Sequence, residues 1–117
     1  ELVRTILVNR GAEVRVAAST AQALRILEGW RPDVIVSDIA MPGEDGFELI
    51  SRLRASEAGS GRRGIPAVAL TALARQEDRT QILMAGFQMH VAKPVNPLEL
   101  ATVIASVAER RDDARLG

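Results

Sequence analysis

The sequence lacks cysteine altogether, and its 117 residues contain no long apolar run. Without thiols the chain can form neither disulfides nor thiolate metal sites, which fits a reducing compartment, and we expect a cytoplasmic protein. Fifteen basic and fifteen acidic residues leave no net charge, so no nucleic-acid-coating surface is predicted. A signal-peptide pattern is absent, and no apolar stretch has the length of a membrane span.

The remaining composition is that of one globular domain. Apolar residues make up 47% of the chain and charged residues 26%, which is ordinary for a soluble protein. A chain of this length can bury one apolar core without disulfides or metals. No repeat or second domain is visible, so we expect residues 1–117 to form a single domain, with residues 109–117 as a charged tail or linker.

Helix and strand signals alternate along the chain. Helical spacing with capping signals predicts helices over residues 1–10, 19–30, 45–55, 75–85 and 96–108. Short apolar or alternating runs predict strands over residues 13–17, 34–37, 67–70 and 89–92, and residues 56–64 read as a flexible polar loop. Strands separated by helices predict an α/β fold in which helices cover both faces of a parallel sheet.

The most informative stretch is the strand that ends at Asp38. Residues 34–37 (VIVS) are apolar or small, and Pro42 and Gly43 follow shortly after. Such a short apolar run predicts a strand buried on both faces. Asp38 would then lie at the carboxyl end of the strand, where ligands bind in open α/β sheets.

Two further polar residues follow the next predicted strands, namely Thr71 and Lys93. Parallel strands end at the same edge, so a carboxylate, a hydroxyl and an ammonium group would meet in one crevice. A carboxylate can attack a phosphoryl donor. The hydroxyl and ammonium groups can then hold the phosphoryl oxygens, which is most of what phosphoryl transfer requires of a protein.

Each of these signals is common by itself, but their order along the chain is specific. The full set resembles the receiver domain of a bacterial two-component response regulator, with a run (HVAKP) similar to receivers of hybrid histidine kinases. The motifs that carry the resemblance cover nearly the whole chain: Val34–Asp38, Met41–Gly43 with Gly46, Thr71–Ala72, Gly86–Phe87 and Lys93–Pro94.

The resemblance implies a flavodoxin-like doubly wound sheet of strand order 2-1-3-4-5. It implies that Asp38 accepts a phosphoryl group from a histidine kinase or phosphotransfer domain, that Thr71 and Lys93 contact this group, and that the Lys93–Pro94 peptide bond is cis. It also implies Mg²⁺, bound in part by Asp38 and the backbone carbonyl of Ala40. The expected partners are the kinase and a downstream output domain or protein, with a homodimer possible and no direct nucleic-acid contact.

The first departure from the family pattern concerns its first strand, which carries two Mg²⁺-binding acids and is missing here. That strand would lie between residues 13–17 and 34–38, and its loss would leave a trench whose unpaired backbone groups cost roughly 1 to 3 kcal/mol each if buried. We therefore hypothesise that the native protein has an upstream strand with these acids. Mg²⁺ binding would be weakened or absent without it.

The second departure is His90, where the family usually has tyrosine or phenylalanine. In the family this ring turns inward when the residue equivalent to Thr71 moves toward the phosphoryl group, and the turn reshapes a partner-binding surface. The resemblance therefore implies that Thr71 and His90 form the switch. As a metal ligand, His90 lacks partners in the sequence.

We weigh three alternatives, and two of them lack a residue that they would need. A degenerate receiver would bind partners without being phosphorylated, which a true lack of the upstream acids would favour. An aspartyl phosphatase would need a second acid two residues after Asp38, and Ala40 stands there instead. A cobalamin carrier would need a histidine in a loop, whereas His90 falls in a predicted strand. For the phosphoacceptor, no enzymatic activity beyond self-phosphorylation and autodephosphorylation is expected.

Overall fold

A computed structural model gives the chain as a three-layer α/β fold, and it describes residues 2–39, 45–61, 64–72 and 76–116. The helices and strands follow one another in this order: α1 Leu2–Asn9, α2 Thr20–Gly29, β1 Ile35–Ile39, α3 Asp45–Ser60, β2 Ala67–Thr71, α4 Gln76–Ala85, β3 Met89–Ala92 and α5 Pro97–Leu116. Over the described residues, none of the helices has the length and apolar character needed to cross a membrane.

The strands of the described residues form one parallel sheet in the order β1-β2-β3, as the alternation of helices and strands predicted. Five residues of β1 pair in register with β2, from Ile35 opposite Ala67 to Ile39 opposite Thr71. All five residues of β2 are buried, because this strand has a neighbour on either edge and helices on either face. This sheet matches the last three strands of the predicted order 2-1-3-4-5.

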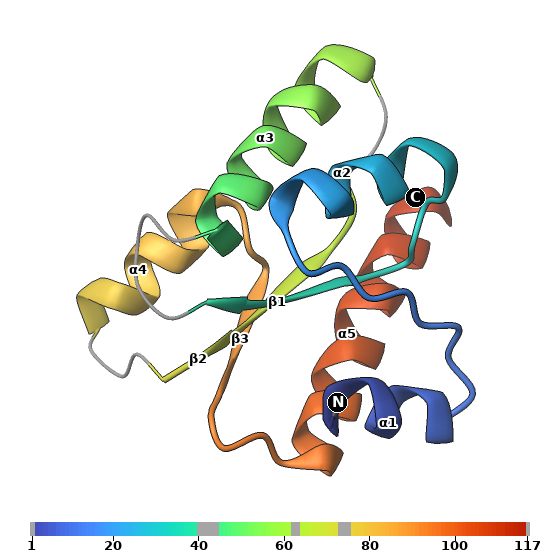
Figure 1. The fold of residues 1–117 in the computed structure, drawn as a ribbon, viewed down its shortest axis with the longest axis vertical. Helices are drawn as coiled ribbons and strands as arrows, with labels where there is room; N and C mark the ends of the chain where they lie inside the picture. The colour runs from blue at the N-terminus through green and yellow to red at the C-terminus, as the bar shows by residue number, and fades with distance from the viewer. Residues whose placement is uncertain (1, 40–44, 62–63, 73–75, 117) are drawn as a thin grey trace.

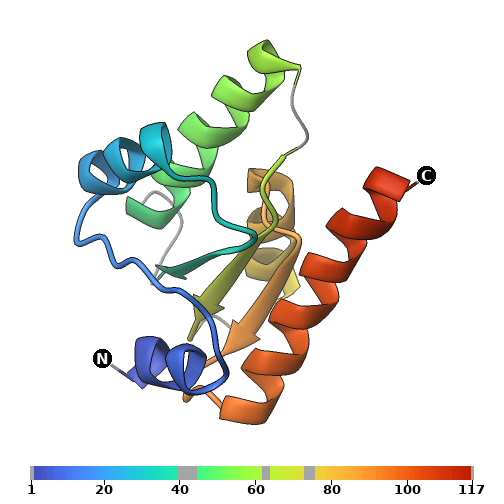
Figure 2. The same cartoon turned by 90° about the vertical axis from the view of Figure 1, so that its right-hand side faces the viewer.

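Two apolar clusters lie on opposite faces of the sheet. Figure 2 shows α3 on one side of the strands and α5 on the other, and α1 lies beside α5 in both views (Figure 1). The buried residues on the α3 and α4 side are Ile39, Ile50, Leu53, Ile65, Ala67, Ala69, Ile82 and Phe87. Those on the α1 and α5 side are Ile6, Val68, Leu70, Val91, Leu100 and Val107.

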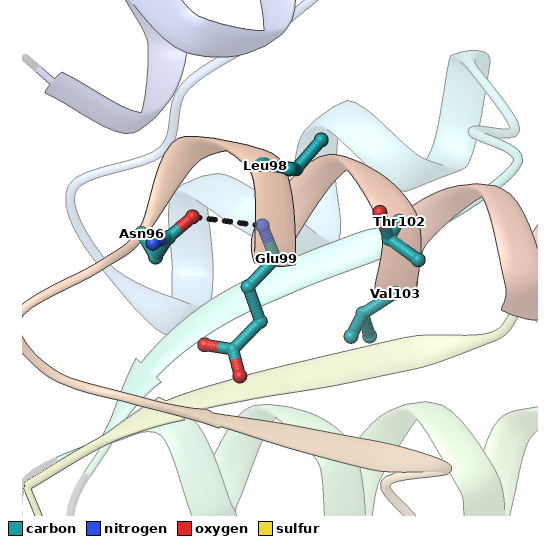
Figure 3. Close-up of a pocket in the computed structure, with 5 residues that line it drawn as sticks. All are labelled: Asn96, Leu98, Glu99, Thr102 and Val103. Atoms are coloured by element: carbon teal, nitrogen blue, oxygen red, sulfur yellow. Dashed lines mark hydrogen bonds between the residues drawn. The ribbon is translucent and has the colours of Figure 1, made fainter.

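The helix ends confirm the capping signals that the sequence predicted. Ser19 Oγ accepts a hydrogen bond from the Gln22 N–H at 3.1 Å, at the start of α2. Asn96 Oδ1 accepts one from the Glu99 N–H at 3.0 Å, as Figure 3 shows, and Pro97 begins α5. Gly11 ends α1 with a φ of 88°, a conformation that glycine adopts without strain.

Two predictions about the β1 side of the sheet were wrong. Residues 13–17 form no strand, because no described strand pairs with them and isolated extended backbone gains no ladder hydrogen bonds. β1 is not buried on both faces: only Ile39 is buried, and Ile35, Val36 and Ser37 are half-buried. Both departures occur on either side of the gap in the sheet that the missing first strand was expected to leave.

The predicted loop at residues 56–64 was wrong in its first part, because α3 continues through Ser60. The added turn is held by Ser60 Oγ, which donates to the Glu57 carbonyl oxygen at 2.9 Å. The backbone of α5 is likewise helical through Leu116, beyond the expected end near residue 108. Residues with good helix propensity, such as alanine, arginine and glutamate, support this extension.

A half-buried arginine of α3 forms hydrogen bonds at the amino-terminal end of the sheet. The Arg54 guanidinium donates to the Gly86 carbonyl oxygen from Nε at 3.1 Å and from Nη2 at 2.9 Å, and pairs with Glu57 at 2.6 Å. The other Glu57 oxygen accepts the Ile65 N–H at 2.8 Å, and Gln88 Oε1 accepts the Ala67 N–H at 2.7 Å. We call Arg54, Glu57 and Gln88 the arginine clamp.

We predict that Arg54→Met lowers the free energy of unfolding by about 2–4 kcal/mol, because it leaves the nearly buried Glu57 carboxylate without its cation. The matched control is Arg52→Met in the same helix, where the ion pair with Glu48 is exposed and the expected change is within about 0.5 kcal/mol. Urea unfolding monitored by circular dichroism measures both. Equal losses in the two variants would show that the clamp does not stabilise the fold.

Candidate functional site

The strand-end residues that the sequence singled out meet at one edge of the sheet. Asp38 lies near the carboxyl end of β1, and Lys93 directly follows β3. Lys93 Nζ lies 2.5 Å from Asp38 Oδ1, so the two charged groups form an ion pair across the end of β2. The Asp38 side chain is 63% exposed and that of Lys93 38%, so both are open to a ligand from solvent.

Thr71 lies at the end of β2, between the strands that carry the charged pair. It is fully buried, and its carbonyl oxygen accepts a hydrogen bond from the Lys93 N–H at 2.9 Å. This bond fixes the backbone of Lys93 to the central strand. The Lys93–Pro94 peptide bond that follows is cis, which confirms what the resemblance implied.

His90 shares a sheet face with Thr71. Its register partner on β2 is Ala69, whereas Thr71 is opposite Ala92. Side chains two residues apart on a strand point to the same face, so His90 and Thr71 are diagonal neighbours on the α3 and α4 side. His90 is half-buried. The geometry suits the proposed switch pair, while the switching itself stays a prediction.

Close packing of α3 against β1 sets the position of the strand end that carries Asp38. Gly46, in the first turn of α3, is buried. A Cβ atom at this position would clash with Ile39 Cγ2 and would lie 2.9 Å from Ser37 Oγ. Gly46 is part of the motif that carries the resemblance, but this contact was not predicted from it. The signal that could have revealed it is a glycine in the first turn after a strand, where close backbone approach excludes a side chain.

The described residues alone do not make a complete Mg²⁺ site. No three histidine or acidic side chains among them are grouped so that they could hold a metal ion. Asp38 supplies one carboxylate, and Ala40, the other predicted ligand, lies outside the described residues, as do Met41–Gly43. Mg²⁺ takes six oxygen ligands in near-octahedral geometry, several of them often water or phosphate, so this donor set is short of what the ion needs from the protein.

A groove of about 940 Å³ opens beside Asp38 and runs along β1. Its walls come from α1, residues 11–20, α2, β1 and α5. A second hollow of about 410 Å³, at the start of α5, is lined by Asn96, Leu98, Glu99, Thr102 and Val103 (Figure 3). That hollow contains none of the strand-end residues.

The sheet edge can therefore support nucleophilic chemistry at a carboxylate. Asp38 offers exposed oxygens next to a fixed cation, and a negative group approaching Asp38 would meet the Lys93 ammonium. A buried hydroxyl, that of Thr71, is one strand away. This set matches the needs of phosphoryl transfer to a carboxylate.

Comparison with protein families and known sequences gives consistent results. The profile described as "Response regulator receiver domain" matches residues 1–105. An uncharacterised 14.6 kDa protein of Leptolyngbya boryana is 47% identical over 104 residues, which are 89% of this chain and 77% of that protein. The sensor protein GacS of Pseudomonas syringae is 33% identical over 88% of this chain, and the matched part is only 11% of GacS.

Solved structures agree with the fold. A receiver domain of a Pseudomonas aeruginosa sensor histidine kinase, described with magnesium in its active-site cleft, is 35% identical, with a TM-score of 0.76 over 92% of this chain and 86% of its own. A Francisella response regulator receiver domain is 27% identical, with a TM-score of 0.80 over 94% of this chain and 87% of its own.

We predict that Gly46→Ala lowers the free energy of unfolding by about 1–3 kcal/mol, because the new methyl group collides with the end of β1. The control is Gly59→Ala in the same helix, where no atom lies within 4 Å of a Cβ and alanine should stabilise by roughly 0.5–1 kcal/mol. Urea unfolding gives the energies, and the Asp38 amide signal in NMR spectra reports the strand end. A Gly46→Ala variant as stable as Gly59→Ala would refute the contact.

Proposed function

The chain belongs to the response regulator receiver domain family, and we propose that it is a phosphoacceptor of a two-component phosphorelay in which Asp38 receives the phosphoryl group. The observation that carries this proposal is the exposed Asp38 carboxylate held 2.5 Å from Lys93 Nζ at the carboxyl edge of the sheet. Relatives in both sensor kinases and transcriptional regulators, such as PhoB of Pseudomonas aeruginosa, fit a shared signalling module.

The proposed step transfers a phosphoryl group from a phosphohistidine. An Asp38 oxygen attacks phosphorus, the bond between phosphorus and the imidazole nitrogen breaks, and that nitrogen keeps the electron pair and regains a proton. The product is an acyl phosphate on Asp38 and a free histidine on the donor. Lys93 is already within contact distance of the attacking carboxylate, so its ammonium can turn to a phosphoryl oxygen without a backbone movement.

Thr71 and His90 are the residues that we propose to read out this event. The Thr71 hydroxyl is buried, so it would have to turn toward the sheet edge to reach a phosphoryl oxygen. Such a movement of Thr71 would leave space on its face of the sheet, next to the half-buried His90 ring. A shift of both side chains would change the surface near β3 and bias its contacts with a kinase, an output domain or a second copy. We propose the cytoplasm as the compartment.

Mg²⁺ is the ion that we propose as the cofactor, since ions of this kind neutralise charge in phosphoryl transfer. The neighbour from Pseudomonas aeruginosa is described with magnesium in its active-site cleft. Here Asp38, and the backbone carbonyl of Ala40 as the resemblance implies, would supply part of its ligands. Because the described residues offer so few donors, we propose that ligands beyond them are needed for tight binding.

The same shortage of ligands favours a second candidate, a degenerate receiver that binds partners without phosphorylation. In that case the ion pair between Asp38 and Lys93 would be a structural feature of the interaction surface. The phosphorylation experiment below separates the two functions.

We predict that incubation with Mg²⁺ and a small acyl or amido phosphate adds one phosphoryl group to the chain, and that Asp38→Asn abolishes the addition. The matched control is Asp33→Asn, because Asp33 is exposed near the opposite end of the same strand. Intact-mass spectrometry measures the product. Equal labelling of Asp38→Asn would place the acceptor elsewhere, and no labelling of the parent under conditions that label a known receiver would favour the degenerate module.

A further prediction concerns the ion itself. Mn²⁺, used as a paramagnetic substitute for Mg²⁺, should broaden the NMR signals of Asp38 and its neighbours, with half-saturation at millimolar concentrations, because few protein ligands are present. Asp38→Asn should weaken the effect at least about tenfold by removing the carboxylate, whereas Asp33→Asn should leave it unchanged. Micromolar binding that is indifferent to Asp38→Asn would contradict the proposed ligand.

A further inference from the structure

His90, the single histidine of the chain, belongs to a row of three residues that crosses the sheet. Its register partner on β2 is Ala69, and Ala69 in turn is opposite Ser37 on β1. All three side chains lie on the α3 and α4 side of the sheet. The row has an imidazole at one end, a hydroxyl at the other and a methyl group between them, so a ring turning inward from β3 meets only that methyl group on β2.

The middle of this row is apolar and dry, whereas the ring of His90 is in contact with water. Ala69 and its neighbours Ile39 and Ile82 are each 1% exposed or less. No described residue forms a hydrogen bond or ion pair with the imidazole, and neither of its ring nitrogens is buried without a partner. The imidazole nitrogens are therefore solvated as the side chain stands, and an inward turn would remove them from water.

The strands offer no acid to a charged His90 ring on this face. Residues 67–71 of β2 include no ionisable side chain, and the Asp38 carboxylate points to the face opposite that of Ser37. α5 packs on that opposite face as well. The charged residue that follows β3 is Lys93, a cation that is paired with Asp38.

The helices on this face offer one acid that is not exposed or already paired. The described charged side chains of α3 and α4 are Glu48, Arg52, Arg54, Glu57, Glu77, Asp78 and Arg79. Those of α3 form two ion pairs with each other, and those of α4 are exposed except for Asp78. Asp78 is half-buried and lies one turn before the buried Ile82, on the same side of the helix. Its charge has to be separated from that of His90 in any experiment.

From these observations we infer that His90 makes the proposed switch sensitive to pH, because only the neutral imidazole turns inward across Ala69 and protonation keeps the ring in water. This inference rests on the proposed phosphorylation of Asp38. A neutral ring can exchange hydrogen bonds with the hydroxyl groups of this face, whereas an imidazolium would lose its hydration in apolar surroundings. The negative charge of a phosphoryl group is offset by Lys93 and the proposed Mg²⁺, so the loss of hydration decides the sign.

The direction of the effect follows from linkage. An ordinary imidazole titrates near about pH 6.5, so acid should oppose the phosphorylated conformation and mild alkali should favour it. Because coupling between two binding events is reciprocal, occupation of the site at Asp38 should in turn drive a proton from His90. A phenylalanine ring at this position would turn inward at either pH.

Binding of beryllofluoride, a stable analogue of the phosphoryl group, in the presence of Mg²⁺ tests this inference. An ordinary imidazole is about nine-tenths charged at pH 5.5 and almost wholly neutral at pH 8. Between these pH values the affinity of the parent should therefore fall about tenfold more than that of His90→Phe. His90→Phe is the matched control, because it keeps a flat ring without a charge and because pH effects on Asp38, Lys93 and the analogue are common to both proteins. Calorimetric titration gives the affinities.

Two further measurements identify the group that titrates. At pH 6 the NMR ring signals of the single histidine should move toward those of the neutral form when the analogue binds. Asp78→Asn should leave the tenfold difference unchanged, and a difference that disappears in this variant would overturn the inference.

Equal pH dependence of the parent and His90→Phe, or ring signals that move toward the charged form, would also overturn the inference while the phosphoacceptor function stands. If neither protein binds the analogue at pH 8, the proposed function itself fails, and the inference fails with it.

Discussion

Parallel pairing of β1, β2 and β3 is the constraint on which the site and the core both depend. It places the ends of three strands, far apart in sequence, at one edge of the sheet, and so brings Asp38 within 2.5 Å of Lys93. The same pairing buries β2 completely and separates the two apolar clusters. If the register of either pair slipped by one residue, apolar side chains would move to the wrong face and the charged pair would separate.

Stability and chemistry lie at opposite ends of this sheet. At the amino-terminal end the arginine clamp joins α3, β2 and the turn before β3 through charged groups that are mostly buried. At the carboxyl end Asp38 and Lys93 are exposed, and their ion pair adds little to stability. A ligand can therefore break the pair at low cost while the clamp keeps the strands in place. This division of roles would suit the modification of Asp38 that we propose.

Much of the fold could be predicted because local signals and the sheet agree. The caps at Ser19 and Asn96 and the bounds of β3 were predicted from the sequence, and the gathering of Asp38, Thr71 and Lys93 follows from parallel strands alone. Long-range contacts decided the rest. In the last turns of α3, the Glu57 carboxylate accepts hydrogen bonds from Arg54 and from the Ile65 N–H. The pairing with Ile65 lies outside the helix, and no local sequence pattern predicts it. Residues 13–17 have the alternation of a strand, but a strand also needs a neighbour.

The most direct test of the central claim uses the absence of cysteine from the chain. In the double variant Asp38→Cys with Lys93→Cys, the two thiols should lie about 10 Å apart at most, because β1 and β3 flank one strand. A thiol-specific cross-linker of about that reach should join them within one molecule. Asp33→Cys with Lys93→Cys places the thiols near opposite ends of the sheet, and this pair should remain unlinked. Equal cross-linking of the two pairs, or linkage of the second alone, would contradict the shared edge.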